Sequence, residues 1–185
     1  MTITMPIKAS FDVETKSMGD DPYVLEVTSL SVIGSDEPWK LNLWDQDHID
    51  DGIEYMLTFP GLVSFNGRKF DIPTLLKYIE RPLGGKLRSL PHYDIYDEFL
   101  RIYSRRISLS NMAKYTLNID KWDLQTMSAS AMWRLDPEKL FKYNAWDTYL
   151  TYLLYTHTVS FGSLFFKMPT LQRFVPQTIS RPGGL

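Results

Sequence analysis

The first quarter of the chain is rich in apolar and β-branched residues, and one of its segments shows the two-residue repeat of apolar and polar positions that is typical of β-strands. The repeat is clearest where Trp39, Leu41 and Leu43 alternate with Lys40 and Asn42. A turn cluster, Gly-Ser-Asp-Glu-Pro, precedes this segment and favours a hairpin with the run before it. The predicted strands are residues 7–14, 22–33 and 39–44.

After residue 45 apolar residues recur every three or four positions, and short apolar runs alternate with these helical segments. A long helix is predicted to begin at Asp136-Pro137, because an N-cap acid is followed by proline in the first turn. The predicted helices are residues 49–58, 70–80, 95–103, 109–116 and 136–155, and the predicted short strands are 62–65 and 91–94. This order predicts an α/β fold in which a three-strand antiparallel meander and added parallel strands form one mixed sheet flanked by helices.

Two segments predict irregular structure. Pro82, Gly84 and Gly85 indicate a loop. Residues 1–160 are expected to form one domain, and residues 161–185, which contain several prolines and glycines, an extended arm or partly disordered tail. The apolar residues of that arm either cover the domain's own surface or contact a replication protein or a second copy; they are Phe165, Phe166, Leu171 and Phe174.

Composition narrows the chemistry. The 185 residues carry 20 Lys and Arg against 22 Asp and Glu, a formal net charge of -2, so a nucleic acid must be held by a local patch or through metal ions. The absence of cysteine excludes disulfides, zinc–cysteine sites, iron–sulfur clusters and thiol nucleophiles. With three scattered histidines, a metal is expected to have oxygen ligands. No signal-peptide core and no long apolar run is present, so we expect a cytoplasmic protein.

The first candidate site residues are Asp12 and Glu14, which share one face of the strand over residues 7–14 while Phe11 and Val13 share the other. Two neighbouring carboxylates repel each other unless a cation lies between them. The alternative is a strand end with solvated acids.

Two further places carry acids that could join this pair. Asp71 begins the helix over residues 70–80, where it could equally be an N-cap. Tyr143 and Asp147 are four residues apart and share a face of the last helix, where they could equally be a surface pair. If the four carboxylates converge, they suit two hard divalent cations, Mg²⁺ or Mn²⁺, which can activate a water for attack on a phosphodiester.

Three segments of the chain resemble the exonuclease motifs of the DEDD superfamily of ribonuclease H-like 3′→5′ exonucleases. They read F-D-V-E-T (11–15), F-N-G-R-K-F-D-I-P-T-L (65–75) and Y-N-A-W-D-T (143–148). The resemblance runs from about residue 7 to residue 155 and is closest to the proofreading exonuclease domain of B-family DNA polymerases and its free-standing relatives. Because Lys142 stands where the histidine subgroup has its histidine, the resemblance implies the tyrosine subtype, DEDDy.

The resemblance implies metal ligation by four carboxylates and orientation of the attacking water by Tyr143; the ligands are Asp12, Glu14, Asp71 and Asp147. Thr15 and Asn66 are candidates for holding the 3′-terminal nucleotide. Phe65 and Phe70 either stack against bases or pack in the core. Asp94 is expected to be structural.

The leading hypothesis is a two-metal-ion 3′→5′ exonuclease that acts on single-stranded or frayed 3′ ends, most readily DNA, and releases nucleoside 5′-monophosphates in replication proofreading or repair. The alternatives are a catalytically silent nucleic-acid-binding or scaffold subunit and an RNA-trimming exonuclease. Five cations either form a phosphate patch or are solvated surface charges: Arg68, Lys69, Lys114, Lys121 and Lys142.

Overall fold

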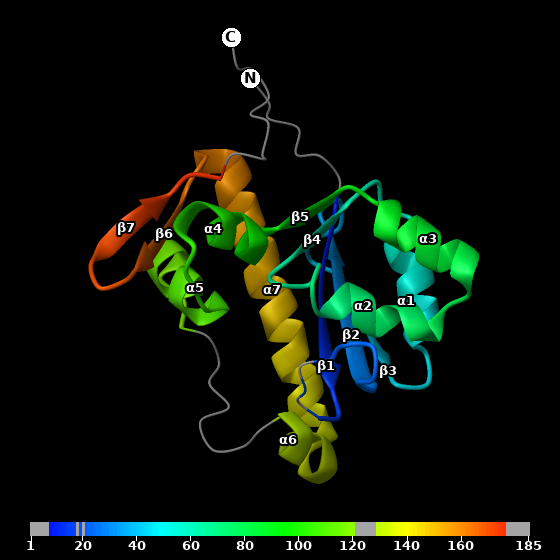
Figure 1. Cartoon of the computed structure of the whole chain (residues 1–185). Coiled ribbons are helices and arrows are strands. Elements are labelled where there is room, and N and C mark those ends of the chain that lie inside the picture. Colours follow the sequence, from blue (N-terminus) through cyan, green and yellow to red (C-terminus); the bar gives the residue numbers. More distant parts are fainter. Residues whose placement is uncertain (1–7, 18, 20, 121–128, 177–185) are drawn as a thin grey trace.

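The computed structural model describes residues 8–17, 19, 21–120 and 129–176 (Figure 1). Its main sheet contains strands β1 (Ala9–Thr15), β2 (Val27–Gly34), β3 (Leu41–Asp45), β4 (Leu62–Ser64) and β5 (His92–Asp94). The helices are α1 (Ile49–Met56), α2 (Asp71–Leu75), α3 (Arg81–Ser89), α4 (Ile95–Tyr103), α5 (Leu109–Leu117), α6 (Ala129–Leu135) and α7 (Pro137–Phe161). A 3-10 turn (Leu76–Tyr78) extends α2, and a hairpin of β6 (Leu164–Lys167) and β7 (Leu171–Phe174) follows α7.

The sheet has the order β3-β2-β1-β4-β5. Strands β1, β2 and β3 pair antiparallel as a meander, and β4 and β5 continue the sheet parallel to β1. This is the mixed α/β sheet that the order of strands and helices predicted. It makes β1 the central strand, and the cross-strand partner of Asp12 on β2 is Ser31.

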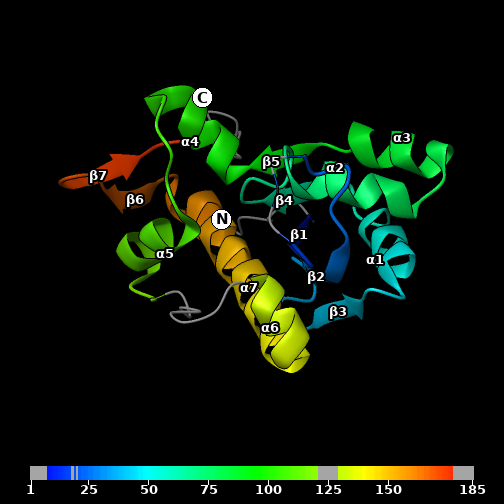
Figure 2. The same cartoon turned by 60° about the horizontal axis from the view of Figure 1, so that its bottom comes forward.

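Alternation along β1 divides the core into two clusters. Ala9, Phe11 and Val13 face a cluster with α1, α2 and α3, while Asp12 and Glu14 fall on the face crossed by α7. The second cluster joins α4, α5, α7 and the β6–β7 hairpin. Figures 1 and 2 show these two groups of helices on opposite sides of the sheet.

Helix α3 occupies the segment where we predicted a loop, so that prediction is wrong. Glu80 is extended as N-cap, and Pro82 sits in the first turn, where its missing N–H has no helical partner to lose. Gly84 is buried, and a Cβ there would lie 3.2 Å from Leu76, so the glycine allows the helix to approach closely. Leu87, 1% exposed, anchors the helix in the core.

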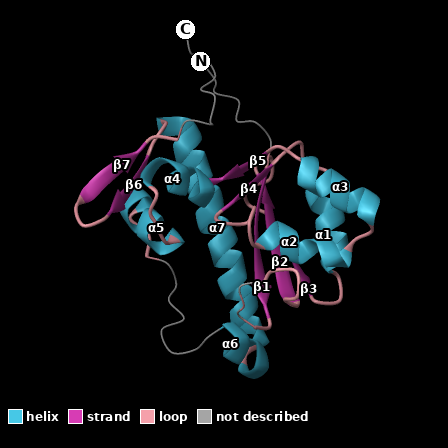
Figure 3. Cartoon of the chain, viewed as in Figure 1, coloured by secondary structure: helices cyan, strands magenta, loops and turns pink. Residues whose placement is uncertain are grey.

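The segment after residue 160 also differs from the extended arm that we expected. Residues 164–174 form the β6–β7 hairpin (Figure 3), and Phe166 and Phe174 are buried against Phe99 with ring centroids at 4.9 and 5.5 Å. These rings therefore cover the domain's own surface, the first of the two alternatives. The division into a domain at 1–160 and a tail at 161–185 stays a prediction, and residues 177–185 lie outside the described part.

Within the described ranges, every helix is too short or too polar to cross a lipid bilayer.

Candidate metal centre

Three carboxylates from distant parts of the chain meet on the α7 side of the sheet. Asp12 and Glu14 extend from β1, and Asp147 extends from α7. One ligand oxygen of each lies within 4.8 Å of those of the other two. Asp147 is 6% exposed, and the two β1 residues are half-buried. Like charges at this separation in a partly desolvated site are unfavourable without a cation, so the donor set fits a hard divalent metal.

Local sequence explains how the side chains reach this point. Alternation sends Asp12 and Glu14 to one face of β1, and the pairing with β2 shifts register between Glu14 and Thr15. Such an irregularity re-aims side chains at the end of a strand. Helix α7 begins at Asp136, whose carboxylate accepts a hydrogen bond from the backbone N–H of Lys139, and it crosses β1 and β2 to present Asp147.

Asn144 connects α7 directly to Asp12, and the sequence analysis did not identify it. Its side chain is fully buried, and its Nδ2 donates to Asp12 Oδ2 at 3.1 Å. The backbone oxygen of Asn144 accepts a hydrogen bond from Ser31 Oγ at 3.1 Å, and Ser31 also hydrogen-bonds Thr148 Oγ1. The sequence signal that could have indicated Asn144 is its spacing of four from Thr148. This spacing places two polar side chains on one face of the helix, where a buried face is usually apolar.

Asp71 lies outside the three-carboxylate group but within its electrostatic range. It begins α2 and is 5% exposed. Burial raises the pKa of Asp71 well above its usual value, and the charges of Asp94 and Glu14 raise it further. Gly67 makes room for this carboxylate, because a Cβ at that position would lie 2.8 Å from Asp71 Oδ2 and 2.7 Å from Ser64 Oγ.

Asp94 is structural, as expected. Its carboxylate accepts hydrogen bonds from Ser64 Oγ and from three backbone N–H groups, those of Asn66, Arg68 and Asp97, at 2.9 to 3.0 Å. The bonds from Ser64, Asn66 and Arg68 fix the turn between β4 and α2, and the bond from Asp97 caps α4. This turn therefore sets the position of Asp71 at the start of α2.

The other predicted site residues lie around this centre. Tyr143 is half-buried on α7, one turn before Asp147. Thr15 Oγ1 donates to the Ser17 carbonyl at 2.8 Å, which is a local bond at the end of β1. Asn66 adopts a left-handed conformation with φ 71° in the turn after β4.

The two phenylalanines are each half-buried, so neither is a full core residue. The ring of Phe65 packs against Tyr96 with centroids 5.7 Å apart. Phe70 directly precedes α2. Their predicted contact with bases stays a prediction.

The five predicted patch cations do not gather in one place. Arg68 and Lys69 line one groove beside β5, whereas Lys142 lines an apolar groove with Trp39 and Tyr149. Lys114 pairs with Asp120 at 2.6 Å. Lys121 lies outside the described residues.

The mixed five-stranded sheet with acidic residues on its central strand and on a crossing helix defines a ribonuclease H-like fold. The chain belongs to the RNase H superfamily, because the family model RNase_H_2 matches residues 9–159. Among solved structures it is similar to the family B DNA polymerase from the hyperthermophilic archaeon Pyrobaculum calidifontis, with a TM-score of 0.61 and 16% sequence identity. That match covers 84% of this chain and 25% of the polymerase, so the likeness concerns the fold of one part of that enzyme. No curated protein sequence matches.

Proposed function

We propose that this protein is a metal-dependent 3′→5′ exonuclease that hydrolyses phosphodiester bonds at single-stranded or frayed 3′ ends, with DNA as the leading substrate. The observation that carries the proposal is the convergence of Asp12, Glu14 and Asp147 within 4.8 Å. The RNase H-like fold supports it, since members of that superfamily are commonly nucleases.

Four carboxylates would hold two divalent cations, Mg²⁺ or Mn²⁺. Asp12 would be the best-positioned ligand, because it extends from the central strand and its carboxylate accepts a hydrogen bond from Asn144. Asp71 would serve the second ion; burial raises its pKa, and the charges of Asp94 and Glu14 raise it further, so a nearby cation would favour its ionised form. Bound cations would supply water activation and stabilisation of the leaving oxygen.

The chain's own side chains would orient the reactants. The Tyr143 hydroxyl can accept or donate a hydrogen bond, and we assign it to positioning the attacking water. Asn66 and Thr15 would bind the 3′-terminal nucleotide, and Phe65 or Phe70 would contact its base. The products would be nucleoside 5′-monophosphates, and the biological setting would be proofreading or repair.

A labelled oligonucleotide tests the reaction and its direction. A 5′-labelled single strand with Mg²⁺ or Mn²⁺ should yield a ladder that shortens from the 3′ end, and a circular strand should remain intact. Asp12→Ala and Asp147→Ala should each abolish the ladder. Asp120→Ala is the matched control, because Asp120 is exposed and lies outside the three-carboxylate group. Wild-type rates in the Asp12→Ala, Asp147→Ala double variant would overturn the proposal.

The same preparation decides between the alternatives. Matched DNA and RNA strands separate a DNA exonuclease from an RNA-trimming one, since the 2′-hydroxyl distinguishes them. Calorimetry with Mn²⁺ separates both from a silent scaffold, for which we expect no binding at millimolar metal.

A further inference from the structure

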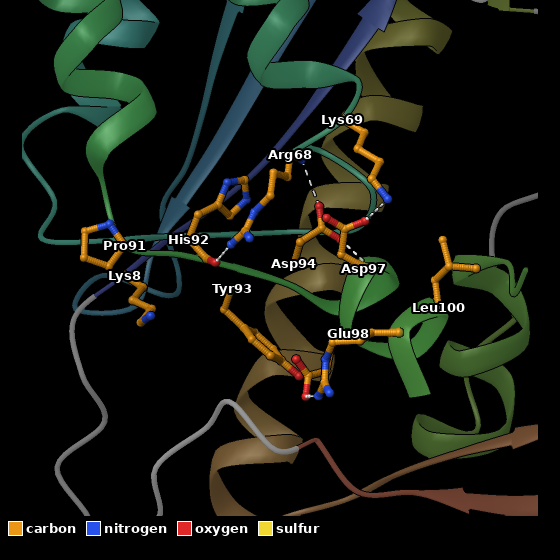
Figure 4. A pocket seen from close by; sticks show the side chains of 11 residues that line it. Lys8, Arg68, Lys69, Pro91, His92, Tyr93, Asp94, Asp97, Glu98 and Leu100 are labelled. Carbon is orange, nitrogen blue, oxygen red and sulfur yellow. Dashed lines mark hydrogen bonds and ion pairs between the residues drawn. The ribbon is translucent and has the colours of Figure 1, made fainter. Parts of the chain in front are cut away.

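A second feature with chemical character lies outside the carboxylate centre, along the outer edge of β5. It is a groove of about 600 Å³ between the start of β1, the turn before α2, β5 and α4 (Figure 4). We name it the β5 groove. Its charged lining comprises Lys8, Arg68, Lys69, Asp94, Asp97, Glu98 and Arg101.

Two of the four cations that line the groove form ion pairs within it, and the other two do not. Lys69 pairs with Asp97 at 2.8 Å, and Arg101 pairs with Glu98 at 2.9 Å. Asp94 is directed into its own turn, as described above. Lys8 and Arg68 are therefore the lining cations for which the described residues provide no carboxylate within 4.0 Å.

The two remaining cations both lie near His92. Both act on the His92 ring, whose pKa burial lowers to about 4, so the ring adds no charge at neutral pH. Burial lowers the pKa of Lys8 as well, which means that its ammonium is partly removed from water without a compensating acid in the described chain. Arg68 is held in place because its guanidinium donates to the His92 carbonyl.

Tyr93 also lines the groove, but its hydroxyl is buried. Tyr93 is 6% exposed, and its hydroxyl has no hydrogen-bond partner in the described part of the molecule. Figure 4 shows its side chain extending from β5 towards the Glu98 side chain. The groups that remain for recognition of a phosphate are the two cations, Lys8 and Arg68.

We propose that the β5 groove binds a backbone phosphate of the nucleic-acid strand whose 3′ end occupies the carboxylate centre. The inference rests on the proposed function for its ligand. The turn that connects β4 to α2 lies between the β5 groove and the carboxylate centre. Asp94 lines the groove, and the charges of Asp94 and of Glu14 both raise the pKa of Asp71. A strand that leaves the centre over this turn reaches the groove.

Binding without hydrolysis tests the groove independently of catalysis. Anisotropy of fluorescein-labelled deoxythymidine oligonucleotides, two to twelve residues long, is measured in EDTA at several salt concentrations. Lys8→Ala and Arg68→Ala should each weaken binding of the twelve-residue strand about three- to fivefold, the upper range for an exposed charge pair. Each should also reduce the slope of log K against log salt by about 0.7, the value for one lost contact to a single strand.

Matched controls exclude a general charge effect. Lys40→Ala and Arg81→Ala remove exposed cations just before β3 and at the start of α3, neither of which lines the groove, and should leave binding unchanged. Wild-type affinity and salt slope in both groove variants would overturn the proposal. An equal loss for thymidine 5′-monophosphate would overturn the assignment to a strand, because the groove would then hold the free nucleotide.

A small substrate separates this inference from the proposed function. Thymidine 5′-(4-nitrophenyl phosphate) has one nucleotide and does not extend over the turn, so both groove variants should hydrolyse it at the wild-type rate. If the wild type cleaves neither this ester nor an oligonucleotide, the proposed function fails, while the measurements in EDTA still decide the groove.

Discussion

The hydrogen bond from Asn144 to Asp12 joins helix α7 to the central strand, and its strength can be worked out from the structure. A hydrogen bond to a charged group contributes about 1.5–3 kcal/mol. Since Asp12 is half-buried and water can partly replace the amide, we expect the lower end, about 1.5 kcal/mol. Asn144→Ala alone does not measure this value, because the variant also removes Oδ1, which is buried with no hydrogen-bond partner among the described residues. Relief of that unpaired oxygen opposes the loss of the bond.

A double-mutant cycle isolates the bond. Urea unfolding in EDTA is compared for wild type, Asn144→Ala, Asp12→Ala and the double variant, and the coupling energy should be about 1.5 kcal/mol. This equals a change of about 3–6 °C in Tm for a chain of this size. Titration with Mn²⁺ gives a second readout, in which Asn144→Ala should bind metal about tenfold more weakly, as expected for a residue that orients a ligand. A coupling energy below about 0.5 kcal/mol, the limit for independent sites, would refute the reasoning.

Three further predictions concern the surroundings of the centre and the hairpin. Burial raises the folded-state pKa of Asp71, so the free energy of unfolding of the metal-free protein should fall as pH rises from about 4. Asp71→Asn should remove this fall and raise the free energy of unfolding at pH 8 by about 1–3 kcal/mol, measured by urea unfolding. Equal pH slopes for the wild type and the variant would contradict this prediction. Gly67→Ala places a Cβ 2.8 Å from the Asp71 carboxylate and should destabilise the protein by about 1–3 kcal/mol and reduce exonuclease activity, whereas Gly85→Ala, with open space around it, should do neither. Phe174→Ala should lower the free energy of unfolding by about 3–5 kcal/mol because the ring is fully buried, and the exposed Leu171→Ala is the control; an unchanged Phe174→Ala would show that the hairpin contributes nothing to the core.

Local sequence signals predicted most of the main sheet and the long helix: apolar and alternating residues indicated the strands, and an N-cap acid followed by proline indicated the start of the helix. The alternation over residues 39–44 and the N-cap at Asp136 are both local signals. Strand β3 and helix α7 begin within a few residues of the predicted positions. Helix α3 was missed because proline and glycine indicate a break locally, whereas here packing of Leu87 and the close approach of Gly84 to Leu76 decide the structure. The β6–β7 hairpin was missed because it is stabilised by contacts with α4 and α5, whose contacting residues lie 49 or more positions earlier.

The candidate metal centre was likewise predicted only in part. The shared face of Asp12 and Glu14 follows from strand alternation, and the position of Tyr143 one turn before Asp147 follows from helical spacing. What the sequence did not reveal is the contact of Asn144 with Asp12, which joins residues 132 positions apart. The sequence also could not reveal that Lys8 and Arg68 line one groove, since this depends on the parallel pairing of β1, β4 and β5.

The polar contact between β2 and α7 bears on protein design. Ser31 lies directly across from Asp12 and binds both Thr148 and the backbone of Asn144, so it fixes where along the helix axis α7 rests on the sheet. Leucine or valine at these positions would pack about as well at several offsets of the helix, and an offset of a single turn, about 5.4 Å, would carry Asp147 away from Asp12. A designer who transplanted only the carboxylates into another scaffold would move the ligands without the contacts that set their alignment. The smallest transferable unit is therefore the carboxylates together with Ser31, Asn144 and Thr148.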